Sequence, residues 1–168
     1  MDKNYSQTKK LTISALVISL YVVILYVTQS FSFGAYQIRI ATSMYALSYL
    51  FPFLVIPLGL ANFIANALFG GLGILDMVGG CLVGMITSGA IVLIRKRHLP
   101  FWLSGVPILL GPGLLVPIWL SYCLHLPYKA LAISLVIGQS VPSICGVLLI
   151  QIMQRVLCGR KKEGNLAK

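Results

Sequence analysis

The sequence predicts an all-α integral membrane protein with six transmembrane helices and both termini in the cytoplasm. Composition is the first reason: of 168 residues, 58% are hydrophobic and 10% are charged, whereas soluble domains carry about 25% charged residues. The second reason is that the basic residues gather in three clusters beside long apolar runs, at residues 3–10, 95–97 and 155–162. Such clusters mark the cytoplasmic ends of membrane spans, so the net charge of +10 does not indicate nucleic-acid binding.

The number of spans follows from the spacing of the basic clusters. If all three are cytoplasmic, the chain crosses the membrane an even number of times between each pair. Two crossings between residues 11 and 94 would leave about forty residues over, because a span needs about 20. Four crossings therefore fit this part better, and two more fit between residues 99 and 154.

Glycine and proline place the breaks between spans, at "QSFSFGAYQ" (29–37), "FPFLVIP" (51–57), "FGGLG" (69–73) and "LHLPYK" (124–129). The first apolar run is too long for a signal-peptide core, so we expect it to stay attached as a span. A six-helix domain at 10–155 then follows an N-terminal cytoplasmic tail at 1–9 and precedes a basic cytoplasmic tail at 156–168. The expected spans are 10–29, 38–52, 55–69, 75–94, 101–122 and 130–154.

Three charged residues lie outside the clusters and tails: Arg39, Asp76 and Lys129. They begin the second, fourth and sixth expected spans, so all three should lie at the external rim. An ionisable residue in a membrane segment indicates a functional site. The alternatives are a helix-terminal role for Asp76, which would satisfy free N–H groups and the helix dipole, and snorkelling of the two cations to the headgroups.

Polar and aromatic neighbours favour a binding site at this rim. Asn62 and Asn66 are four residues apart and share one face of the third span. Polar faces of apolar helices need partners, which the interior of a helix bundle provides. Aromatic rings near the rim could stack on a planar ligand, or could belong to an interfacial aromatic belt. The other candidate binding residues are Thr42, Ser43 and Gln139, with Tyr36 and Tyr45 as the stacking rings.

Several catalytic functions lack their residues. The chain has no G-x-x-x-x-G-K-[ST] loop, so it should not hydrolyse ATP itself. Asp76 is the only acidic residue outside the tails, and the four cysteines show no C-x-x-C spacing. We therefore expect neither an enzyme nor a metal or other cofactor in this chain.

Small residues mark faces where helices can approach closely. Gly80, Gly84 and Ser88 recur every fourth residue in the fourth span, where packing within the chain is favoured. Ala15 and Ser19 recur in the same way in the first span. This second pair is the candidate docking face for another protein.

Three stretches resemble the QueT-type queuosine-precursor transporters: "SALVISLYVVILYV", "SFGAYQIRIA" and "ANFIANALFGGLGILDMVGGCLVG". These transporters are substrate-binding S components of energy-coupling factor (ECF) transporters. The resemblance implies a six-helix S-component bundle in the bacterial plasma membrane, which takes substrate from outside. It also implies docking on a transmembrane T subunit driven by two cytoplasmic ATPases, so that ATP is hydrolysed by partner subunits. The family's Ala-x-x-x-Ala docking face maps onto Ala15 and Ser19.

The resemblance further implies a 7-deazaguanine substrate such as preQ1, preQ0 or queuine. The 2-amino-pyrimidinone edge of such a base offers two adjacent N–H donors, which the Asp76 carboxylate could accept, while Arg39 or an asparagine amide meets the carbonyl. The family usually has Arg-Ile-Ser-Glu-Ala after this arginine, and here Thr42 replaces the glutamate. Two other functions remain open: an S component for another vitamin-like solute, and a non-transporting scaffold or assembly subunit.

Overall fold

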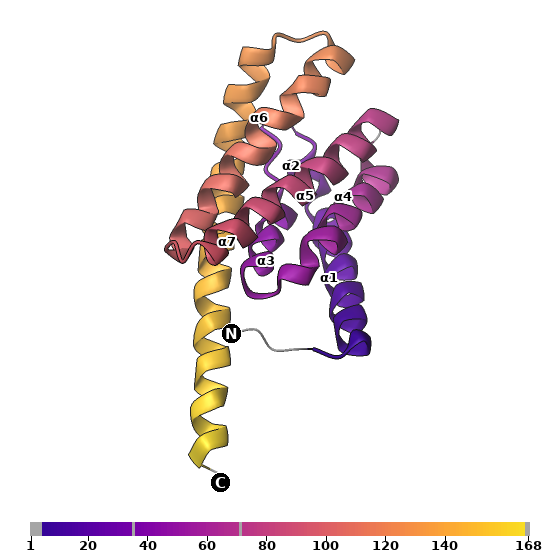
Figure 1. Cartoon of the computed structure of the whole chain (residues 1–168). Helices are drawn as coiled ribbons and strands as arrows, with labels where there is room; N and C mark the ends of the chain where they lie inside the picture. Colours follow the sequence, from indigo (N-terminus) through magenta and orange to yellow (C-terminus); the bar gives the residue numbers. More distant parts are fainter. Residues whose placement is uncertain (1–4, 35, 71, 167–168) are drawn as a thin grey trace.

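The computed structural model describes residues 5–34, 36–70 and 72–166, with side chains up to residue 157. Every secondary-structure element in this part of the chain is a helix (Figure 1), so the expectation of an all-α protein is confirmed. The long helices are α1 (Gln7–Val27), α4 (Val55–Phe69), α5 (Ile74–Lys96), α6 (Gly105–Leu124) and α7 (Tyr128–Leu166). The short ones are α2 (Gln29–Ser32), α3 (Leu47–Leu50) and the 3₁₀ helices η1 (Ile40–Ala46), η2 (Pro52–Leu54) and η3 (Phe101–Ser104).

Among the described residues, five helical segments are long and apolar enough to cross a membrane, and they match the first, third, fourth, fifth and sixth expected spans. The 3₁₀ turns η2 and η3 lengthen α4 and α6 at their N-terminal ends, and α7 continues past the expected boundary at residue 154. Gly73 separates α4 from α5 with φ 81°, in the left-handed region that favours glycine. The segments are Gln7–Val27, Pro52–Phe69, Ile74–Lys96, Phe101–Leu124 and Tyr128–Leu157.

The second expected span, 38–52, is not a continuous α-helix, and this prediction was wrong in form. The segment instead consists of η1 followed by the single turn α3. Polar side chains explain the tighter winding: the Thr42 hydroxyl lies 2.7 Å from the Arg39 carbonyl oxygen. The Ser48 hydroxyl likewise donates to the Tyr45 carbonyl at 2.7 Å. Both bonds reach back three residues, and such side-chain bonds compete with the α-helical ladder.

This short segment nevertheless runs along most of α5. At its start, Arg39 bonds to Asn66 beside the beginning of α5. At its end, Arg95 from the last turn of α5 donates to the carbonyls of Tyr49 and Leu50. Seven 3₁₀ residues and four α-helical residues rise by about 20 Å. The side chains of Arg39 and Arg95 span the remaining length of α5.

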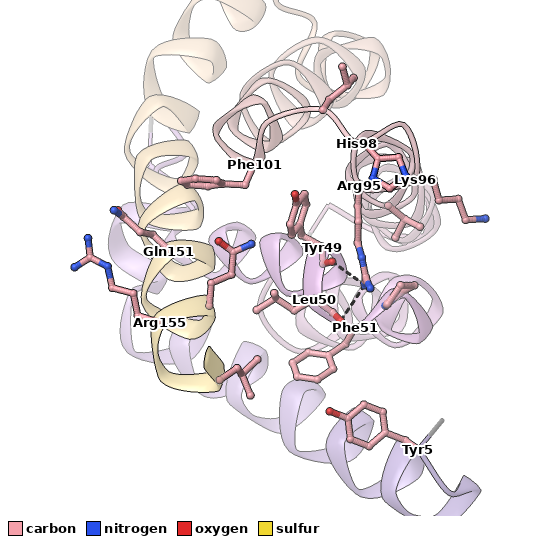
Figure 2. Close-up of a pocket in the computed structure, with 15 residues that line it drawn as sticks. Tyr5, Tyr49, Leu50, Phe51, Arg95, Lys96, His98, Phe101, Gln151 and Arg155 are labelled. Carbon is pink, nitrogen blue, oxygen red and sulfur yellow. Dashed lines mark hydrogen bonds between the residues drawn. The ribbon is translucent and has the colours of Figure 1, made fainter. Parts of the chain in front are cut away.

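Parts of the three basic regions line one cavity at one side of the molecule. In Figure 1 the α4–α5 and α6–α7 connections lie at the top, whereas the start of α1 and the α5–α6 connection lie lower. A cavity of about 980 Å³ is lined at once by Tyr5, Arg95, His98 and Arg155, one or more from each region. Figure 2 shows the Arg95 guanidinium, which donates to the backbone carbonyls of Tyr49 and Leu50.

The main buried core joins α1, η1 and α4. α1 packs on α4 and η1 through three buried side chains, Val17, Tyr21 and Leu25. The opposite face of α1 is exposed, and Leu16 and Val27 are among its exposed large side chains. α1 therefore lies at the edge of the bundle, with most of its apolar surface free of contacts within the described chain.

Candidate functional site

Arg39 lies at the centre of a buried polar cluster, and only 7% of its surface is exposed. Its Nη1 donates to Asn62 Oδ1 at 3.3 Å and its Nη2 donates to Asn66 Oδ1 at 2.8 Å. The guanidinium carbon also sits 4.8 Å from the centre of the Phe33 ring, within cation–π range. Among the described residues the Arg39 Nε atom has no hydrogen-bond partner. The Nε–H group is thus a buried donor without a partner in this part of the chain.

The Asn62 carboxamide is held from its other end. Its Nδ2 donates to the Tyr45 hydroxyl at 2.8 Å and to the Gly80 carbonyl at 2.8 Å. With two acceptors on the Nδ2 side, the Oδ1 atom must face the Arg39 guanidinium, which has only donors. α5 can come this close to α4 because residue 80 is glycine, and a side chain there would collide with the Asn66 amide.

Asn66 links Arg39 to the first turn of α5. While its Oδ1 accepts from Arg39, its Nδ2 donates to the Asp76 backbone carbonyl at 2.9 Å. No direct ion pair joins Asp76 to Arg39 or Lys129 within the described part of the chain; the connection to Arg39 runs through the Asn66 amide. Lys129, the other isolated cation, is exposed.

Asp76 is 4% exposed, and its two carboxylate oxygens differ. Oδ1 accepts a hydrogen bond from the Trp119 indole at 3.2 Å, whereas Oδ2 is buried without a partner among the described residues. Helix α5 has Gly73 at its N-cap, with no side-chain hydrogen bond there. Among the described residues no backbone N–H bonds to either carboxylate oxygen, so the capping part of the helix-terminal alternative is not seen, whereas the position of Asp76 in the first turn does favour the helix dipole. A side chain at Gly70 would lie 2.9 Å from Oδ2.

Trp119 joins this cluster through its bond to Asp76, whereas the sequence leaves it open between stacking on a planar ligand and an interfacial belt. The indole packs flat against α5 at Gly79, where an added Cβ would lie 2.9 Å from the ring. The only available signals were the aromatic residue itself and the glycine pair at 79 and 80. A lone tryptophan in a membrane helix equally fits an interfacial belt.

Thr42 and Gln139 extend the cluster toward α7. Both are buried, and the Thr42 hydroxyl lies 2.9 Å from Gln139 Oε1 as well as 2.7 Å from the Arg39 carbonyl. A hydroxyl has one proton, so these two oxygens compete for it. Gln139 Nε2 donates to the Gln37 carbonyl at 3.4 Å. Gln37 has φ 44°, an uncommon value outside glycine, next to the segment that carries Arg39.

The remaining candidates are distributed differently. Ser43 is buried, and its carbonyl oxygen faces Gly146 of α7, where an added Cβ would lie 3.2 Å away. Tyr45 is fully buried and stacks on Tyr21 with ring centres 6.0 Å apart, so it does not present a free face to a ligand. Tyr36 is 55% exposed and lies outside the buried cluster.

Ala15 and Ser19 lie on the exposed face of α1. Their helix buries the residues between and beyond them, Val17 and Tyr21, against the bundle. The two small residues are therefore accessible to another protein or to lipid.

Neither described cavity contains the Arg39–Asp76 cluster. The larger one, drawn in Figure 2, lies on the side where the basic regions meet. The smaller one, of about 300 Å³, lies between α6 and α7 and is lined by Trp102, Gly105 and Ser143 with apolar neighbours. The polar side chains of the cluster bond to one another instead of lining an open cavity.

The fold and this site define a multi-pass membrane protein with a buried polar cluster formed mainly by η1, α4, α5 and α6. The chain matches the QueT transporter family over residues 11–155, and it belongs to that family. This assignment confirms the resemblance seen in the sequence and makes the protein a member of a transporter family. No curated protein and no solved structure matches the chain.

Proposed function

We propose that the chain is the substrate-binding subunit of an ECF-type uptake transporter and captures a queuosine precursor from outside the cell. One observation carries this proposal: a carboxylate oxygen and a guanidinium nitrogen, Asp76 Oδ2 and Arg39 Nε, are buried without partners among the described residues. Leaving such groups unsatisfied costs about 1–3 kcal/mol each, and more when they are charged. A ligand that supplies both partners would recover this cost.

The 2-amino-pyrimidinone edge of a 7-deazaguanine has the required pattern. Its two adjacent N–H groups could donate to the Asp76 carboxylate, which has about four acceptor positions and can keep its bond to Trp119. The carbonyl beside them could accept from the free Arg39 Nε. The planar ring would then lie near the Trp119 indole and the Phe33 ring.

Binding also requires the cluster to open. Arg39 donates to both Asn62 and Asn66, and Trp119 lies against Gly79. Residues 37–39, just before η1, have no regular secondary structure. We propose that this segment shifts to admit a base beside Asp76 while Arg39 keeps its bond to Asn62.

The test is direct binding with a matched pair of bases. Purified protein in detergent is titrated with 7-deazaguanine and with 7-deazahypoxanthine, which lacks the 2-amino group, and then with preQ1, preQ0 and queuine. We expect 7-deazaguanine to bind at least tenfold more tightly than 7-deazahypoxanthine, because one donor to Asp76 is missing from the latter. Equal affinities would contradict the assigned contact. Binding of a different vitamin-like solute, or of no small molecule, would favour the other transporter or the scaffold function.

The partners and orientation form part of the same proposal. A T subunit would dock on the exposed face of α1 at Ala15 and Ser19, and two cytoplasmic ATPases would hydrolyse the ATP. The basic regions around the larger cavity would face the cytoplasm of a bacterial plasma membrane. The η1–α3 segment, which runs along α5, would then be the second of six crossings.

A further inference from the structure

We propose that Tyr45, anchored by Tyr21 of α1, is a positioning residue for Arg39 and thereby ties the edge helix α1 to the substrate site. This inference rests on the proposed function, because it assigns a role at the same site. Neither tyrosine needs to touch the ligand. Their effect passes through the Asn62 carboxamide.

A continuous series of hydrogen bonds supports the proposal. The hydroxyls of Tyr21 and Tyr45 lie 3.3 Å apart, and both residues are fully buried. The Tyr45 hydroxyl accepts from Asn62 at 2.8 Å, and Asn62 accepts from Arg39 at 3.3 Å. The series begins on α1, passes through η1 and α4, and ends at the guanidinium.

The orientation of Asn62 explains why Tyr45 matters. An amide group can face Arg39 with its oxygen or with its NH₂, and only the oxygen can accept from the guanidinium. Tyr45 supplies one of the two acceptors that hold the NH₂ end away from Arg39, and Gly80 supplies the other. Removing the Tyr45 hydroxyl weakens this hold and loosens the guanidinium that faces the ligand.

Tyr21 gives the series its connection to α1. The buried side chains of α1 are Val17, Tyr21 and Leu25, so Tyr21 is the polar one among them. A shift of α1 against η1 would stretch the bond between the two tyrosines. Contact of another subunit with the exposed face of α1 would therefore change the position of Arg39. Binding of a base would in turn restrain α1.

Tyrosine-to-phenylalanine variants test the proposal because they keep the rings and remove the hydroxyls. The control is Tyr26→Phe, since Tyr26 is also on α1 but is exposed and packs its ring against Phe69. Affinity for 7-deazaguanine is measured by calorimetry. We expect it to fall roughly 3- to 10-fold in Tyr45→Phe and roughly 2- to 5-fold in Tyr21→Phe, as for one lost hydrogen bond. Tyr26→Phe should bind like the parent.

A double-mutant cycle separates positioning from a general loss of structure. If Tyr45 acts through Asn62, then Tyr45→Phe should weaken binding less than twofold in an Asn62→Ala background. Full additivity of the two changes, or unchanged affinity in both single tyrosine variants, would overturn the proposal. If Tyr45→Phe fails to fold, Tyr21→Phe combined with Asn62→Ala carries the same test.

A measurement without ligand distinguishes failure of this inference from failure of the proposed function. Hydrogen–deuterium exchange is followed in the peptide that covers η1. We expect exchange to be faster in Tyr21→Phe than in the parent and unchanged in Tyr26→Phe. If the parent binds none of the bases, the proposed function fails, and faster exchange in Tyr21→Phe alone would still support the link between α1 and the Arg39 site. Equal exchange in all three proteins would overturn that link.

Discussion

Replacing Asp76 by asparagine changes the proposed contact to the base while keeping the size of the side chain. Oδ1 accepts from Trp119, so the amide oxygen of the variant should keep that bond and the NH₂ should take the place of Oδ2. Two sets of donors would then face each other when a deazaguanine binds. Losing a buried charged hydrogen-bond partner typically costs about 2–5 kcal/mol, which corresponds to a loss of about 30-fold to several thousand-fold in affinity.

Folding should change much less than binding in this variant. The Asp76 side chain does not cap α5, and the lost charge in the first turn is worth about 0.3–1 kcal/mol of helix-dipole stabilisation. The assay is calorimetric or fluorescence titration of purified Asp76→Asn protein that elutes as a single species. Asp2→Asn makes the same chemical change in the N-terminal tail and serves as the control. An affinity of Asp76→Asn within about threefold of the parent would refute the assigned role of the carboxylate.

Three further predictions concern docking, topology and the cations. Ser19→Leu should block uptake in cells while sparing base binding by the purified protein, because the larger side chain prevents close approach at α1; normal uptake would remove this face as the docking surface. In a cysteine-free background, a cysteine at Leu126 should react with an impermeant reagent from outside and one at His98 should not, and the reverse pattern would invert the topology. Arg39→Lys should weaken base binding at least tenfold, because lysine cannot bond to two asparagines as a planar fork. The affinity of Lys129→Gln for the base should stay within threefold of the parent's, because Lys129 is exposed. Equal losses of affinity in Arg39→Lys and Lys129→Gln would contradict the assignment of Arg39 to the site.

The sequence predicted the long helices well because their limits are set locally. Glycine at 73 and the basic residues at 95–97 lie at the two ends of α5, and the charge pattern required the basic regions to share one side. The segment at 38–52 was predicted less well. Its apolar composition fits a helix of either kind, and its 3₁₀ form depends on the bonds made by Thr42 and Ser48 once it is buried.

The candidate site was predictable where charge and spacing carry the information. Arg39 and Asp76 stood out as isolated charges, and Asn62 and Asn66 as a pair on one helical face. The roles of Trp119 and Tyr21 depend on tertiary packing: one bonds to a residue of a neighbouring helix and the other to a residue of η1. No spacing rule within a single helix encodes such a contact.

The central claim is that a deazaguanine binds between Asp76 and Arg39, and the ligand that the protein carries from its own cell tests it most directly. Parent and Asp76→Asn proteins are produced in parallel, solubilised gently and purified, and the small molecules they release are identified by mass spectrometry. The account predicts a deazaguanine in near-equal molar amount from the parent and little or none from Asp76→Asn. Release of the same compound in equal amounts from both proteins, or of a compound without the 2-amino-pyrimidinone edge from the parent, would contradict it.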